Sequence, residues 1–223
     1  MTLFPSFGIH INMQKNRSEG VFEGWLDANR LEWRPIPPGP SRTPDYVVTV
    51  APGVEVIFEL KQIETARDWK EDVVHGGEVG ASIRERINRS KSQIKASSAE
   101  GRAAVLVVFN HYDPMQLSGT ENHDFIAAMY GGYTLKLGAE SRRITGRFLG
   151  DGKLFQSNKN TSFSALARLK QSGREAVPNV TIFENIHALN PLDYGALPRC
   201  FEVVRFESDT PKAPSAGDRA SLP

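Results

Sequence analysis

The chain has 223 residues, 39% of them apolar and 24% charged, and its formal net charge is +1. These values suit one medium-sized globular domain. We expect a cytoplasmic protein, because no apolar run approaches the roughly 20 residues that span a bilayer and no signal peptide opens the chain. Cys200 is the sole cysteine, which excludes internal disulfides and cysteine-based zinc sites.

A first helix is predicted for residues 18–30, with Ser18 as its cap. Four apolar residues fall on one arc of this helix: Val21, Phe22, Trp25 and Leu26. Glu19 lies at the edge of the arc, whereas Glu23 is turned further toward solvent, so Glu19 is the better candidate for a site beneath the helix. The alternative is a first-turn acid that only complements the helix dipole.

A strand beginning at residues 31–34 and a β-hairpin over residues 43–61 are predicted next. The hairpin is indicated by two runs rich in Val, Ile and Phe on either side of an Ala-Pro-Gly turn. The proline-rich residues 35–40 cannot continue a strand ladder, because proline lacks the donor N–H. We therefore expect a loop here, leading into the hairpin.

Two carboxylates and a lysine are predicted to meet at the open end of this hairpin. Strand alternation places Glu59 and Lys61 on one face, while Phe58 and Leu60 face the core. The hairpin folds its strand ends together, so Asp45 should lie near Glu59. Converging carboxylates repel each other unless a divalent cation lies between them, and Mg²⁺ takes one or two carboxylates together with waters and phosphate oxygens.

A long helix is predicted for residues 78–99, with isoleucines on its buried face. Polar and cationic residues follow one flank, namely Arg84, Asn88, Lys91 and Lys95, and Arg86, Arg89 and Gln93 follow the other. Such rows can bind a phosphate backbone, and the alternative is an ordinary solvated surface. Gln62, directly after the hairpin, is a further candidate near a phosphate or simply a solvated strand end.

Residues 102–109 are apolar without alternation, which predicts a strand buried on both faces. The predicted order of elements is therefore helix, three strands, helix, strand. Asn110, His111 and Asp113 follow the last strand and are candidates for substrate contact, although a turn initiated by Asp-Pro is the simpler interpretation.

Pro44-Asp45, followed by Glu59-Leu60-Lys61, resembles the signature of the PD-(D/E)XK nuclease superfamily. The resemblance covers about residues 19–109 and implies an α/β fold with a restriction endonuclease-like αβββαβ core, in which helices flank a central mixed sheet. It implies that Asp45, Glu59, the backbone carbonyl of Leu60 and Glu19 hold Mg²⁺, for which Mn²⁺ can substitute. In this interpretation Lys61 positions or activates the attacking water.

The expected function is thus a Mg²⁺-dependent nuclease, acting on DNA as an endonuclease of restriction, repair or defence type; a homodimer would suit cleavage of both strands. One alternative is a non-catalytic module of the same scaffold that binds nucleic acid or docks a protein. Another is an unrelated α/β enzyme in which Asp45, Glu59 and Lys61 form an ordinary strand-end ion cluster. That alternative predicts that Asp45 and Glu59 lie far apart.

The second half of the chain carries weaker patterns. Helices are predicted for residues 122–130 and 162–171, and strands for 133–137, 144–148, 179–183 and 201–206. Arg142, Arg143 and Arg147 form a small basic group beside aromatic residues, a nucleic-acid contact of low specificity. We expect one domain over residues 1–207, with its core at 18–110 and an extension at 111–207, and a disordered tail at 208–223.

Overall fold

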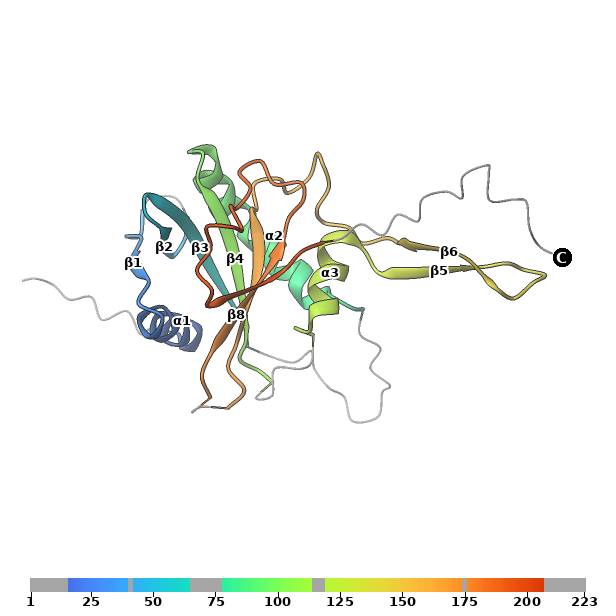
Figure 1. Ribbon diagram of the computed structural model, residues 1–223, viewed down its shortest axis with the longest axis horizontal. Coiled ribbons are helices and arrows are strands. Elements are labelled where there is room, and N and C mark those ends of the chain that lie inside the picture. Colours follow the sequence, from blue (N-terminus) through green and yellow to red (C-terminus); the bar gives the residue numbers. More distant parts are fainter. Residues whose placement is uncertain (1–15, 40–41, 65–77, 114–118, 174–175, 207–223) are drawn as a thin grey trace, which may run out of the picture.

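The computed structural model describes residues 16–39, 42–64, 78–113, 119–173 and 176–206. In these ranges the chain forms a mixed α/β fold around a seven-stranded sheet, with a separate two-stranded ribbon (Figure 1). The elements are α1 (Arg17–Ala28), β1 (Glu32–Pro35), β2 (Tyr46–Ala51), β3 (Val54–Ile63), α2 (Ala81–Ala99), β4 (Ala103–Asn110), α3 (Asn122–Tyr130), β5 (Tyr133–Leu137), β6 (Ile144–Leu149), β7 (Ala165–Lys170), β8 (Asn179–Glu184) and β9 (Phe201–Val204).

The first six elements follow the predicted order of helix, three strands, helix, strand. Strands β1, β2 and β3 are antiparallel neighbours, and β4 lies parallel to β3. The β3–β4 connection runs through α2, as a parallel pair requires. The prediction of a central mixed sheet flanked by helices is confirmed.

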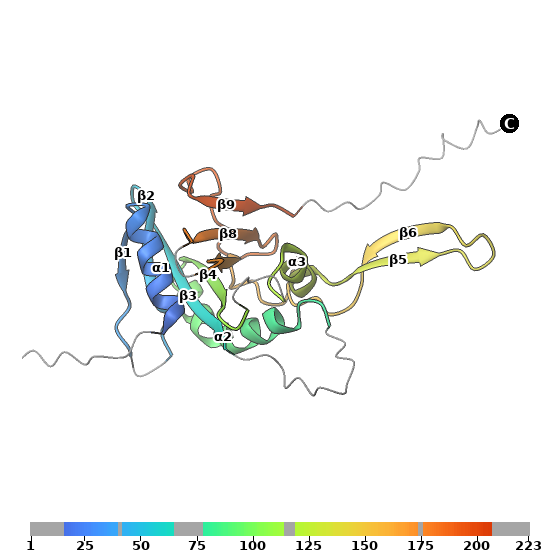
Figure 2. The same ribbon diagram turned by 90° about the horizontal axis from the view of Figure 1, so that it is seen from below.

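Two apolar cores lie on opposite faces of the sheet. On one face, Phe22 and Trp25 of α1 pack with Phe58 and Leu60 of β3. On the other face, the isoleucines of α2 pack with Ile57 and with alternate residues of β4. Figure 2 shows α1 and α2 on the two sides of the strands. The central strands are therefore buried on both faces, as the unbroken apolar run at residues 102–109 predicted.

The predicted helix over residues 162–171 is wrong, because this stretch contains β7. Strand β7 lies parallel to β4 and antiparallel to β8, and β8 pairs in parallel with β9. Ala165, Leu166, Ala167 and Leu169 are fully buried in this position. Ala, Leu, Arg and Lys favour helices when considered alone, but pairing with two neighbouring strands and burial outweigh that preference here.

The remaining elements are α3, β5 and β6. Helix α3 contacts α2, and β5 and β6 pair antiparallel with each other in a sheet of their own. Both views show this ribbon projecting away from the body of the molecule (Figures 1 and 2). Within the described ranges, no helix combines the length and apolar character that crossing a membrane needs. The expected tail at residues 208–223 lies outside the described residues.

Candidate active site

Asp45 and Glu59 stand opposite each other at the open end of the hairpin. Tyr46 pairs with Phe58, so continuing the antiparallel register by one residue places Asp45 across from Glu59. The Asp45 amide donates to the Phe58 carbonyl at 3.2 Å, and Asp45 Oδ2 accepts a hydrogen bond from the Leu60 amide at 2.6 Å. The alternative of an ordinary ion cluster predicted separated carboxylates, and the structure brings them together instead.

Glu59 is fully buried, although it is a carboxylate. Its Oε1 accepts a hydrogen bond from Lys61 Nζ, and its carboxyl group also shares a hydrogen bond with the carboxyl group of Asp45. Lys61 keeps 25% of its side chain exposed, so the ion pair reaches the surface at this end. Two carboxyl groups this close together cannot both ionise at low cost unless a further positive charge binds between them.

Burial is the main electrostatic influence on the two carboxyl groups. It raises the pKa of Glu59 to about 8, with a further contribution from the charge of Asp45 and an opposing one from Lys61. Burial also raises the pKa of Asp45, while the Leu60 amide and Lys61 partly offset that increase. Near neutral pH the pair therefore retains a proton unless a cation replaces it.

The alternation predicted for β3 is confirmed. Phe58 and Leu60 belong to the core under α1, and Glu59 and Lys61 share the opposite face with Ile57 and Ile63. The catalytic candidates thus lie on the α2 side of the sheet, next to a strand end.

Glu19 has a different position from the pair. Asn16, not Ser18, caps α1, and Glu19 closes the capping box by accepting the Asn16 amide at 3.1 Å. Glu23, which the helical pattern turned toward solvent, instead accepts the Tyr46 hydroxyl at 2.9 Å. Among the described residues, no three or more acidic, histidine or cysteine side chains gather as a metal-binding group. Asp45 and Glu59 are brought together, and Glu19 does not join them in such a group.

Gln62 links both helices to the end of β3. Its Oε1 accepts the Ser18 amide at 3.0 Å, and its carbonyl accepts Arg86 Nε at 3.2 Å. Gln62, a predicted phosphate contact, thus connects α1 and α2 to β3 through these two hydrogen bonds. Arg86, which the helical pattern placed on a flank, is buried here and also lies 2.9 Å from Glu85 in an ion pair.

The predicted cationic row on α2 extends away from this end of the sheet. Arg84 pairs with Glu78 at 2.7 Å and donates to the carbonyls of Val79 and Ala127. Asn88 and Lys95 are exposed and Lys91 is half-buried, but α2 runs antiparallel to β3 and leads away from Lys61. Lys95 lies nine residues beyond Arg86, about 14 Å along the helix axis. The structure does not gather this row around the carboxylate pair.

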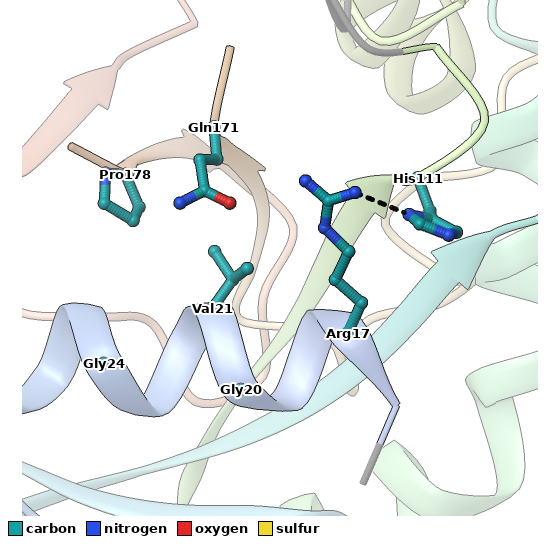
Figure 3. A pocket seen from close by; sticks show the side chains of 7 residues that line it. All are labelled: Arg17, Gly20, Val21, Gly24, His111, Gln171 and Pro178. Carbon is teal, nitrogen blue, oxygen red and sulfur yellow. Dashed lines mark hydrogen bonds between the residues drawn. The ribbon is translucent and has the colours of Figure 1, made fainter. Parts of the chain in front are cut away.

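An open hollow of about 740 Å³ lies on the other face of the sheet, along α1 (Figure 3). Its polar lining residues are Arg17, His111 and Gln171, and Arg17 Nη1 lies 3.5 Å from His111 Nδ1. His111, a predicted substrate contact, donates its amide to the Ile63 carbonyl at 3.0 Å, which places the hollow just past the end of β3. Arg17 carried no sequence signal, because it precedes the predicted helix.

The comparisons with known proteins return no significant match to a protein family, to a curated protein or to a solved structure.

Proposed function

We propose that this chain is a metal-dependent nuclease of the PD-(D/E)XK type, with Asp45, Glu59 and Lys61 as its catalytic residues. The observation that carries the proposal is the pair formed by half-buried Asp45 and fully buried Glu59 where β2 begins beside β3, with Lys61 hydrogen-bonded to Glu59. The order of elements from α1 to β4 also matches the αβββαβ core that the resemblance implies.

The residues present fit a hard divalent cation. Asp45 and Glu59 supply carboxylate oxygens, the Leu60 carbonyl is the third donor that the resemblance implies, and Mg²⁺ needs only one or two carboxylates in addition to waters and phosphate oxygens. When bound, Mg²⁺ or Mn²⁺ would polarise a phosphoryl oxygen and lower the pKa of a coordinated water. Glu19 is left out of this set, because its carboxylate completes the cap of α1.

The chain's own groups have distinct tasks in the proposed reaction. The Leu60 amide holds the Asp45 carboxylate against β3, so that it lies beside Glu59 before any ligand binds. Lys61, partly exposed next to Glu59, presents an ammonium group that can orient the attacking water and offset the charge that develops on the phosphorus oxygens. The expected product is a hydrolysed phosphodiester bond, and we expect DNA as the substrate.

Cleavage of supercoiled and linear DNA with Mg²⁺, with Mn²⁺ and with EDTA tests this proposal. The wild type should cut with either metal and not with EDTA. Lys61→Ala should lower the cutting rate by a factor on the order of 10² or more, because it removes a charge that acts mainly on the transition state. Binding of DNA in EDTA and the circular dichroism spectrum should stay unchanged.

Lys159→Ala is the matched control, since Lys159 is an exposed lysine outside the sheet. It removes the same charge and should cut like the wild type. Full metal-dependent cutting by Lys61→Ala would refute the role of Lys61. A wild type that binds DNA equally with metal and with EDTA, and never cuts it, would instead identify a non-catalytic binding module.

A further inference from the structure

The β5–β6 ribbon, residues 133–149, stands apart from the rest of the fold. Among the strands that the structure describes, β5 and β6 pair only with each other, from Tyr133 opposite Leu149 to Leu137 opposite Ile144. It extends from the side of the molecule that carries α3 (Figures 1 and 2). An isolated two-stranded ribbon is only marginally stable in water, so a bound partner would add to its stability.

The ribbon has a higher net charge than the whole chain. It contains four cations, Lys136, Arg142, Arg143 and Arg147, and one acid, Glu140, which gives +3 against +1 for all 223 residues. The remaining chain therefore carries −2. This positive charge lies on an element that projects from the body, and it favours a polyanionic partner.

Large side chains on the ribbon remain available for contact. Tyr133 is 66% exposed and Leu137 is 61% exposed, and Leu135, Ile144 and Phe148 are also exposed. Alternation places Tyr133, Leu135 and Leu137 on one face of β5, with Lys136 on the other. Apolar and aromatic groups between cations suit a nucleic-acid groove, where they meet thymine methyl groups and base edges while the cations meet phosphates.

We propose that the β5–β6 ribbon lies in a groove of double-stranded DNA and is the second contact surface for the duplex cut at the Asp45–Glu59 site. This inference rests on the proposed nuclease function and names its substrate class. The major groove of B-form DNA, about 12 Å wide, admits a two-stranded β-ribbon, whereas the major groove of A-form RNA is too deep and narrow. The ribbon therefore selects duplex DNA over duplex RNA.

Binding measured in EDTA tests the ribbon without any cleavage. Three proteins are titrated with labelled 30-base-pair DNA and RNA duplexes over a range of salt concentrations: the wild type, the triple variant Lys136→Gln, Arg142→Gln, Arg143→Gln, and a chain in which Asn-Gly replaces residues 134–148. Tyr133 and Leu149 are direct partners, so a two-residue turn can join them. A variant with Arg30→Gln, Lys159→Gln and Arg199→Gln removes the same charge from exposed positions elsewhere and is the control.

The wild type and the control should bind DNA more tightly than RNA. The triple variant should lose about tenfold or more in DNA affinity. Its negative slope of log affinity against log salt should become less steep by about 2.7, because three phosphate contacts are lost. The shortened chain should lose at least as much and no longer prefer DNA.

Three results separate the possible failures. Unchanged affinity and slope in both ribbon variants would overturn the ribbon proposal, even if the wild type cuts DNA. Conversion of a dimer to a monomer on shortening, with unchanged DNA affinity per chain, would also overturn it and identify a self-association arm; analytical ultracentrifugation reads this out. A wild type that binds through the ribbon but never cuts would support the ribbon and refute the nuclease.

Discussion

Glu59 is a fully buried carboxylate opposite Asp45, a second carboxylate. Burial, the neighbouring charge of Asp45 and the opposing charge of Lys61 together bring the pKa of Glu59 to about 8, from an ordinary value of 4.5. In the unfolded chain this carboxyl group is ionised whenever the pH is above its ordinary pKa of 4.5. Between pH 4.5 and about pH 8, the folded protein without metal therefore binds one more proton than the unfolded chain does.

This difference predicts that the stability of the metal-free protein falls as pH rises from about 5 to about 8 and then levels off. The folded state binds more protons in this window, so raising the pH favours unfolding, by an amount on the order of a few kcal/mol. Glu59→Gln removes the titrating group and should flatten most of the slope. Denaturant unfolding at several pH values in EDTA measures the free energy of unfolding directly.

Glu55→Gln is the control on the same strand. Glu55 is exposed, and its hydrogen-bonded ion pair with Arg34 lowers its pKa, so this group gives no slope between pH 5 and 8. A slope that persists unchanged in Glu59→Gln would show that other groups cause it.

The meeting of Asp45 and Glu59 could be predicted from the sequence, whereas the position of Glu23 could not. A short turn fixes the register of a hairpin, so the order of residues alone brings the two strand ends together. The rotation of α1 depends on how Phe22 and Trp25 pack against Tyr46 and Phe201, which are distant in the chain. That packing directs Glu23 to the Tyr46 hydroxyl, and no local pattern records it.

At the scale of single elements, α1 carries two glycines on the side that lines the hollow. Gly20 and Gly24 lie inside a helix of 12 residues, and a Cβ added at either position meets nothing within 4 Å. Glycine in a helix interior is unfavourable because it loses more conformational freedom on folding than other residues. Neither glycine is required by packing in the described structure.

Gly24→Ala should therefore stabilise the protein by about 1 kcal/mol, because alanine favours the helix and fits the open space. Gly53→Ala, at the hairpin turn, is the control, with the same substitution and an effect expected in the opposite direction. Its added Cβ also meets nothing within 4 Å, but Gly53 has a φ of +74°, so alanine should destabilise by about 1 kcal/mol. Thermal or denaturant unfolding measures both changes, and a destabilising Gly24→Ala would contradict the prediction.

Strand β7 shows why some elements could not be predicted. Residues 162–171 contain Ala, Leu, Arg and Lys in a pattern that fits a helix as well as a strand. Its identity is set by β4 and β8, which supply its hydrogen bonds on both sides and bury Ala165 and Leu169. By contrast, β2 and β3 carry their own turn and β-branched residues, so local signals were enough there.

The molecule as a whole depends on strands from its second half. Val105 and Val107 of β4 pack in one cluster with Ala165 and Leu169 of β7, Ile182 of β8 and Phe201 of β9. No local pattern indicates that residues 165–204 complete the sheet of the candidate site, because pairing between strands so far apart in the chain leaves no such pattern.

We therefore expect a fragment of residues 1–160 to lack a cooperative unfolding transition. It would expose the open edge of β4 and the apolar side chains that β7–β9 cover. The chain whose ribbon is replaced by Asn-Gly is the control and should keep the transition, because the ribbon does not pair with the main sheet. Far-UV circular dichroism during denaturation compares them, and a sharp transition in the fragment would show an autonomous N-terminal unit.

Gln62 of β3 is hydrogen-bonded to the helices on both faces of the sheet. This residue follows Lys61 directly, and it holds the start of α1 through its side chain and Arg86 of α2 through its carbonyl. A ligand that displaces α1 from the hollow side would pull on the strand end that carries the lysine. A ligand bound on one face of the sheet would then change how Lys61 lies relative to Glu59 on the other face.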